Sequence, residues 1–162
     1  MKFRVLSDLH VEQRGEIKNP LIGLPPCDYL ILAGDITNLN SFFEFKKFIY
    51  AIQGDYKQIF YVLGNHEWYG KKRDDVILAY RMMAEEFLGI VLLENDFVDI
   101  DENVRILGTT LWSPVSEEGY AMMNDRHFVK REKIHSMHKK ARKFIAESLD
   151  PNRKNIVITH HL

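Results

Sequence analysis

Short apolar and β-branched runs alternate along the chain with longer segments in which apolar residues recur at helical spacing. The short runs predict strands at residues 3–6, 29–33, 59–63, 91–93 and 156–159. Each run is shorter than an ordinary helix, so a strand is the better interpretation. This alternation of elements favours an α/β or mixed layered fold.

Three segments have the apolar spacing of amphipathic helices. The first lies around residues 42–52, where Ser41 and Glu44 predict a capping box at its start. The second covers about residues 74–88 and the third about residues 131–149. The apolar positions of the second helix are Val76, Ile77, Tyr80, Met83, Ala84, Phe87 and Leu88. We expect this stripe to be core and the first helix to lie on one face of a sheet.

Within residues 97–108, apolar and polar side chains alternate before and after a polar turn, which predicts a β-hairpin. A hairpin pairs its strands in antiparallel fashion. A purely parallel sheet is therefore not expected.

Length and composition limit the class of protein. A chain of 162 residues with 46% hydrophobic and 28% charged residues is typical of one packed domain and not of a disordered chain. The net charge of −1 implies no overall attraction to polyanions. Cys27 has no intramolecular partner, so we expect it to be a small buried side chain in a reducing compartment. Without an apolar stretch of membrane-spanning length or a signal-peptide core, the predicted location is cytoplasmic.

Residue types that bind metals follow four of the predicted strands. In chain order they are Asp8, His10, Asp35, Asn65, His66 and the pair His160 and His161. Each motif alone is equally consistent with an ordinary turn. Ligands gather at the carboxyl ends of strands in open α/β sheets, so the four groups can converge in one cleft. Oxygen and imidazole donors without thiolate suit Mn, Fe, Ni, Zn or Mg, and not a structural zinc finger.

These motifs also carry a family resemblance. D-L-H at 8–10, G-D at 34–35, G-N-H-E at 64–67 and T-H-H at 159–161 resemble, in order and spacing, the motifs of the calcineurin-like metallophosphoesterases. The resemblance covers nearly the whole chain, and M-N-D-R at 123–126 is similar to a segment of a bacterial and phage phosphohydrolase branch. It implies a two-sheet β-sandwich flanked by helices, with residues 1–162 forming a single domain of this type.

The resemblance also implies a dinuclear metal site at the strand ends. Asp8 and His10 would bind the first divalent ion, Asp35 would bridge both, and Asn65 and His160 would bind the second. The ions would be Mn, Fe, Ni or Zn. The implied reaction is hydrolysis of a phosphomonoester, phosphodiester or nucleotide by in-line attack of a metal-bridging hydroxide.

Four further residues at or near these motifs receive expected roles. His66 is expected to be the catalytic residue, stabilising the phosphoryl oxygens or protonating the leaving alkoxide. Glu67 and His161 are expected to orient their neighbours, or only to be hydrogen-bonded parts of the structure. Arg126 is expected to reach a substrate phosphate.

The family pattern continues with a G-H-x-H segment beyond T-H-H, whereas this sequence stops at Leu162. We therefore expect the C-terminal part of the family fold to be missing, each ion to lack one protein ligand, and the last strand to keep an open edge for oligomerisation. A second chain or a longer form could supply the ligands. His135 and His138 share a helix face, but surface histidines are the simpler interpretation.

Residues 126–143 concentrate basic side chains, which is consistent with nucleic-acid binding but more simply with a solvated helix face. The leading hypothesis is a dinuclear metal-dependent phosphoesterase. The alternative is a non-catalytic binding or scaffold module that retains the fold. An amidohydrolase barrel is disfavoured because the first motif is D-x-H, not H-x-H, and because the chain is short for a barrel.

Overall fold

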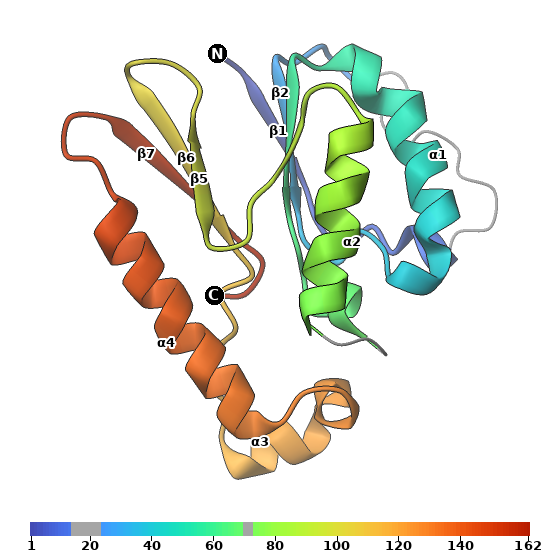
Figure 1. Cartoon of the computed structure of the whole chain (residues 1–162), viewed down its shortest axis with the longest axis vertical. Coiled ribbons are helices and arrows are strands. Elements are labelled where there is room, and N and C mark those ends of the chain that lie inside the picture. Colours follow the sequence, from blue (N-terminus) through green and yellow to red (C-terminus); the bar gives the residue numbers. More distant parts are fainter. Residues whose placement is uncertain (14–23, 70–72) are drawn as a thin grey trace.

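The computed structural model describes residues 1–13, 24–69 and 73–162. Two β-sheets face each other, and helices cover their outer sides (Figure 1). The strands are β1 (Phe3–Leu6), β2 (Tyr29–Ala33), β3 (Gln58–Val62), β4 (Ile90–Leu92), β5 (Asp96–Asp99), β6 (Val104–Thr109) and β7 (Lys154–Thr159). The α-helices are α1 (Phe42–Ile52), α2 (Arg73–Glu86), α3 (Glu117–Met122) and α4 (Arg131–Ser148). The 3-10 turns are η1 (Val11–Gln13), η2 (Leu39–Ser41), η3 (Gln53–Asp55), η4 (His66–Trp68) and η5 (Asn124–His127).

The first sheet has the order β1-β2-β3-β4, and all its strands within the described residues run parallel. The second sheet has the order β5-β6-β7, in which β5 is antiparallel to β6 and β7 is parallel to it. The predicted hairpin is therefore confirmed. Because β1, β2 and β3 are parallel, the loops that follow them all leave the same edge of the first sheet.

Alternate residues of the central strands face two different cores. Leu30 and Leu32 of β2 join the helix-side core, whereas Ile31 and Ala33 face the second sheet. This alternation follows from the two-residue period of a strand and explains why β2 is apolar throughout. Ile106 of β6 lies in the inter-sheet core. The predicted sandwich arrangement is thus confirmed, and the barrel alternative is excluded.

Helices α1 and α2 lie side by side on the outer face of the first sheet, and α4 flanks the second sheet (Figure 1). The apolar stripe of α1 is fully buried at Phe45, Phe48, Ile49 and Ile52. In α4, Ile134, Met137 and Ala141 are buried while the basic face is solvated. In the part of the chain that the structure describes, no helix has the length and apolar content needed to cross a membrane.

Several sequence expectations need correction. Strands β3 and β4 begin one residue before the predicted runs, and β7 begins at Lys154. Leu88 is 95% exposed, because α2 ends at Glu86 before that position can face the core. Ser41 makes no side-chain cap bond, since η2 precedes α1 and is capped by Asn38 instead. Cys27 is only half-buried, because it lies just before β2 begins.

Candidate metal centre

The loops that follow β1 and β2 adopt an unusual backbone conformation. Asp8, His10 and Asp35 have positive φ values of 54°, 45° and 53°. Non-glycine residues rarely adopt this region, and such strain collects at functional sites because the surrounding structure must hold it. Here the two loops hold each other: the backbone N–H of Asp8 donates to Gly34 O (3.0 Å), and that of His10 donates to Asp35 O (3.1 Å).

Two glycines allow the loops to approach closely. A Cβ at Gly34, whose φ is +86°, would lie 2.5 Å from the ring of His160. A Cβ at Gly64 would collide with the side chain and backbone of Asp35. The residues before Asp35 and Asn65 must therefore be glycine for the side chains of three strand ends to share one space.

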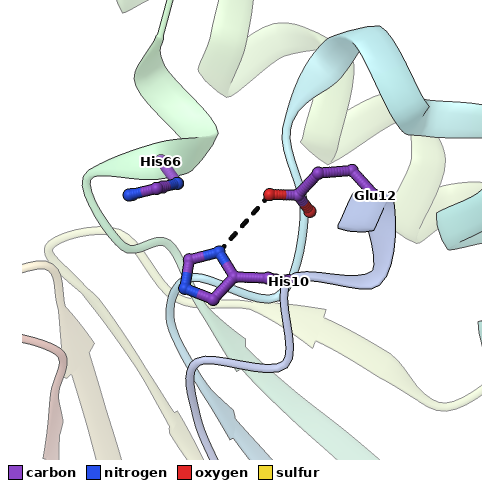
Figure 2. A group of neighbouring side chains, drawn as sticks. All are labelled: His10, Glu12 and His66. Atoms are coloured by element: carbon purple, nitrogen blue, oxygen red, sulfur yellow. Dashed lines mark hydrogen bonds and ion pairs between the residues drawn. The ribbon is translucent and has the colours of Figure 1, made fainter. Parts of the chain in front are cut away.

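One group of potential metal ligands consists of Asp8, His10 and Asp35, whose ligand atoms all lie within 4.8 Å of one another. Nε2 of His10 is 3.9 Å from Oδ2 of Asp35. A second, overlapping group contains His10, Glu12 and His66 (Figure 2). Glu12, from η1, contacts Nδ1 of His10 at 3.3 Å and was not anticipated from the sequence. Only the η1 turn after D-L-H brings its carboxylate back to the ring.

On the opposite side of Asp35, His160 reaches across from β7. Its Nε2 lies 3.4 Å from Oδ1 of Asp35 and 3.1 Å from Oδ1 of Asn65. Its Nδ1 contacts the carbonyl of Ala33 at 2.9 Å. Because that carbonyl can only accept, Nδ1 is the nitrogen that donates to it, so Nε2 is the ring nitrogen that would bind an ion.

Asp35 is therefore flanked on two sides. Its Oδ2 faces His10 and His66, at 3.9 and 3.7 Å, while its Oδ1 faces His160 and accepts the backbone N–H of His66 at 2.9 Å. The residue is only 4% exposed. A buried carboxylate whose two oxygens face separate imidazoles has the arrangement needed to share its charge between two cations.

His161 stands next to this group. Its Nε2 is 3.3 Å from Oδ1 of Asn65, and its backbone N–H donates to Thr110 O at 3.1 Å. Burial, followed by the neighbouring His160, lowers the pKa of His161. The Glu94 carboxylate accepts both the N–H and the hydroxyl of Thr110, so it fixes the segment on which His161 rests.

Glu67 is completely buried directly beneath the loops. Its Oε2 accepts the N–H groups of Gly64 (2.8 Å) and Asp35 (3.0 Å). Its Oε1 accepts the Tyr61 hydroxyl (2.7 Å) and the N–H groups of Ile36 and Thr37. Burial and the Asp35 charge raise the pKa of Glu67, against the opposing effect of these hydrogen bonds. The carboxylate thus ties the loop after β2 to the loop after β3.

Aromatic rings continue from the site toward solvent. The ring of His66 lies 4.5 Å from that of His10 and 4.5 Å from that of Tyr69, between centroids. Tyr69 in turn stacks on Phe128 at 4.3 Å. His66 is thus packed on two sides while 29% of its side chain stays exposed, so its ring can meet a ligand at the mouth of the site.

Comparison with known proteins identifies the family of the chain. The model of the family described as calcineurin-like phosphoesterase matches residues 1–162. The chain belongs to this family. An uncharacterised protein of Acanthamoeba polyphaga mimivirus is 34% identical over 189 residues, which cover 98% of this chain and 67% of the relative. The crystal structure of a phosphopantetheinyl hydrolase from Mycobacterium tuberculosis superposes with a TM-score of 0.70 at 20% identity, covering 98% of this chain and 67% of that one.

The family indicates a metal-dependent phosphoesterase, and the residues at the strand ends fit divalent ions. Carboxylate, amide and imidazole donors converge there, and the proton on Nδ1 of His160 leaves Nε2 available as a ligand. Glu12 also has a buried Oε2 without a hydrogen-bond partner among the described residues. This donor set suits hard or borderline cations.

Other predicted residues lie apart from these ligands. Arg126 is exposed on η5, and no contact joins it to the group within the described residues. His135 contacts the backbone of Val115 instead, and His138 has a buried Nδ1 without a partner in the described part of the chain. Trp112, which has no role in the sequence predictions, is buried beside the site, with its ring centroid 5.4 Å from that of His161.

Proposed function

We propose that this protein hydrolyses phosphate esters with two divalent ions held at the strand ends. The observation that carries the proposal is the position of Asp35, with one oxygen toward His10 and His66 and the other toward His160. Two ions, when bound, would neutralise charge on the phosphoryl oxygens and lower the pKa of the attacking water. Asp8 and His10 would hold one ion, Asn65 and His160 the other.

His66 is the proposed catalytic residue. Its backbone N–H is bound to Asp35 and its ring is packed against His10 and Tyr69, so the imidazole is fixed beside the bridging carboxylate. From this position it would donate a proton to the leaving alkoxide or bind a phosphoryl oxygen. Glu67 would act indirectly, by holding the backbones of Asp35 and Gly64 together.

The substrate class proposed is a phosphomonoester, a phosphodiester or a nucleotide. The metallophosphoesterase resemblance supports phosphoryl chemistry, whereas the selection among these esters depends on the surface around the site. The M. tuberculosis neighbour shares the fold at 20% identity, so its substrate is not carried over. Manganese, iron, nickel or zinc would each accept this mixed oxygen and nitrogen donor set.

The test measures bound metal and turnover together. Protein equilibrated with Mn²⁺ and freed of excess should contain two ions per chain by elemental analysis. It should hydrolyse p-nitrophenyl phosphate or bis-p-nitrophenyl phosphate. Asp35→Asn should lower the number of bound ions and reduce turnover by at least about 100-fold, because weakening the shared ligand lowers the affinity for both ions. Asp55→Asn, an exposed change of the same chemistry on η3, should alter neither quantity.

Unchanged metal content and turnover in Asp35→Asn would contradict the bridging role. Two bound ions without hydrolysis of either ester would contradict the catalytic proposal. That result would favour a binding or scaffold module that keeps the fold and the metal site.

A further inference from the structure

The amide of Asn65 poses an orientation problem at the proposed site. An asparagine side chain has an oxygen at one end and an NH₂ group at the other, with nearly the same shape. Only the oxygen can bind a cation, and the reversed amide would point two hydrogens at it. Something in the protein must therefore select one of the two orientations.

The contacts of Asn65 define the selected orientation. Its Oδ1 faces Nε2 of His160 at 3.1 Å and Nε2 of His161 at 3.3 Å. Its Nδ2 donates to the hydroxyl of Tyr69 at 2.9 Å. Nε2 of His160 makes no hydrogen bond to Oδ1 when it binds an ion, and Nε2 of His161 can donate or accept according to its tautomer. Neither histidine therefore fixes the orientation of the amide, and the contact with Tyr69 must specify it.

A hydroxyl alone cannot make this selection, because it can accept from an NH₂ group or donate to a carbonyl equally well. The choice requires a third group that takes the hydroxyl proton and cannot give one. An ionised carboxylate has this property, since it only accepts. With its own proton committed to a carboxylate, the Tyr69 oxygen must accept, and the group facing it must be the amide NH₂.

Asp125 is suited to be that carboxylate. It lies on η5 in the M-N-D-R segment, is only 5% exposed, and has a buried Oδ1 without a partner among the described residues. Its backbone carbonyl accepts the N–H of Phe128 at 2.9 Å, and the Phe128 ring stacks on that of Tyr69, so the η5 turn lies directly beside Tyr69. Burial, followed by the Asp125 charge, raises the pKa of Tyr69 to about 12. The adjacent Arg126, by contrast, is exposed.

We propose that Asp125, Tyr69 and Asn65 form a directional hydrogen-bond chain that keeps the Asn65 amide oxygen facing the metal centre. Tyr69 and Asp125 are then positioning residues, and the M-N-D-R segment acts on the site through Asp125. The inference rests on the proposed function, because it takes Asn65 as a ligand. Each hydrogen bond in such a chain polarises the next, which also makes the amide oxygen a stronger ligand for the ion.

The competing explanation is that Tyr69 matters only for packing. Its ring lies between those of His66 and Phe128, with centroid distances of 4.5 and 4.3 Å. Tyr69→Phe keeps this stack and removes the hydroxyl alone, so it separates the two explanations. Tyr120→Phe is the matched control, because it removes a hydroxyl that donates to Val129 O at 2.9 Å, next to η5 but away from Asn65.

The first test uses metal-free protein and NMR of the Asn65 side-chain amide. In the wild type, one Nδ2 proton should show the downfield shift and weak temperature dependence of a hydrogen bond. Both features should be lost in Tyr69→Phe and kept in Tyr120→Phe. An Asn65 amide spectrum that Tyr69→Phe leaves unchanged would overturn the chain. This result is independent of turnover, so it stays distinguishable from a failure of the phosphoesterase proposal.

The second test measures Mn²⁺ affinity by calorimetry. Tyr69→Phe and Asp125→Ala should each lower the affinity for one of the two ions by about 10-fold, which is within the range found for residues that orient metal ligands. Asn65→Asp replaces the amide with a carboxylate, which offers oxygen in either orientation. In that background, Tyr69→Phe should change the affinity by less than about 2-fold. A 10-fold loss that persists there would show that the Tyr69 hydroxyl acts on the ion by some route other than the Asn65 amide, and would refute its orienting role.

Discussion

Replacing Glu67 with glutamine tests how the loops of the site are held together. The carboxylate is fully buried and accepts five hydrogen bonds, two at Oε2 and three at Oε1. Glutamine keeps the shape but turns one oxygen into a donor. The less costly orientation puts the NH₂ group at the Oε2 position, where it faces the N–H groups of Gly64 and Asp35.

The magnitude follows from those two lost contacts. Hydrogen bonds to a charged group contribute roughly 1.5–3 kcal/mol each, so their loss amounts to about 3–6 kcal/mol. Glutamine also relieves the burial of a charge, the effect that raises the Glu67 pKa, and this offsets part of the loss. We expect the free energy of unfolding to fall by about 3 kcal/mol, a large share of the roughly 5–15 kcal/mol typical of a domain.

Urea unfolding of the metal-free protein, followed by circular dichroism, measures this change. Glu147→Gln is the control, because its side chain is 65% exposed and its pairing with Lys143 is a surface contact. That variant should stay within about 0.5 kcal/mol of the wild type. A loss below about 1 kcal/mol in Glu67→Gln would refute the view that this carboxylate holds the loops through its hydrogen bonds.

Three further predictions concern the site. Gly34→Ala should lower the free energy of unfolding by at least about 2 kcal/mol, because the added Cβ would collide with the His160 ring and because the backbone there has a left-handed φ. Gly54→Ala is the control: a Cβ there would have nothing within 4 Å, so the midpoint of urea unfolding should change little. His66→Ala should keep both ions by elemental analysis and lose about 10²–10⁴-fold in turnover; a lost ion would make His66 a ligand. Because burial lowers the pKa of His161, the unfolded chain takes up the proton first as the pH falls below about 6.5. The metal-free protein should therefore lose stability as the pH drops toward the folded pKa, and His161→Asn should reduce that loss; equal slopes in both proteins would contradict it.

The sequence predicted the positions of most strands along the chain and the residue types at their ends. Strands β1 and β2 have the predicted bounds, and Asp8, Asp35 and His160 come together after their strands as expected. These features are local, since strand periodicity and chain direction decide which side chains leave the sheet at a given edge. The ends of helices were less predictable. At Leu88 the apolar pattern continues beyond α2 although the helix has already ended.

Other parts of the site had no local signal. Glu12 follows D-L-H as an ordinary polar residue, and only the η1 turn brings it to His10. Asp125 lies nearly sixty residues from Tyr69 in sequence, and its burial depends on how η5 packs. Its neighbour Arg126 is the residue that the sequence predicts to reach a substrate phosphate. Which member of the motif faces inward is a matter of tertiary packing.

The sequence by itself determined the set of donors at the strand ends, because residue identity and strand direction are properties of the chain. Only the tertiary structure decided which atom of each donor faces which neighbour. The two oxygens of Asp35 are divided between His10 and His160 because Gly34 and Gly64 let loops distant in sequence approach without a Cβ between them. That division depends on contacts between loops, which no local pattern encodes.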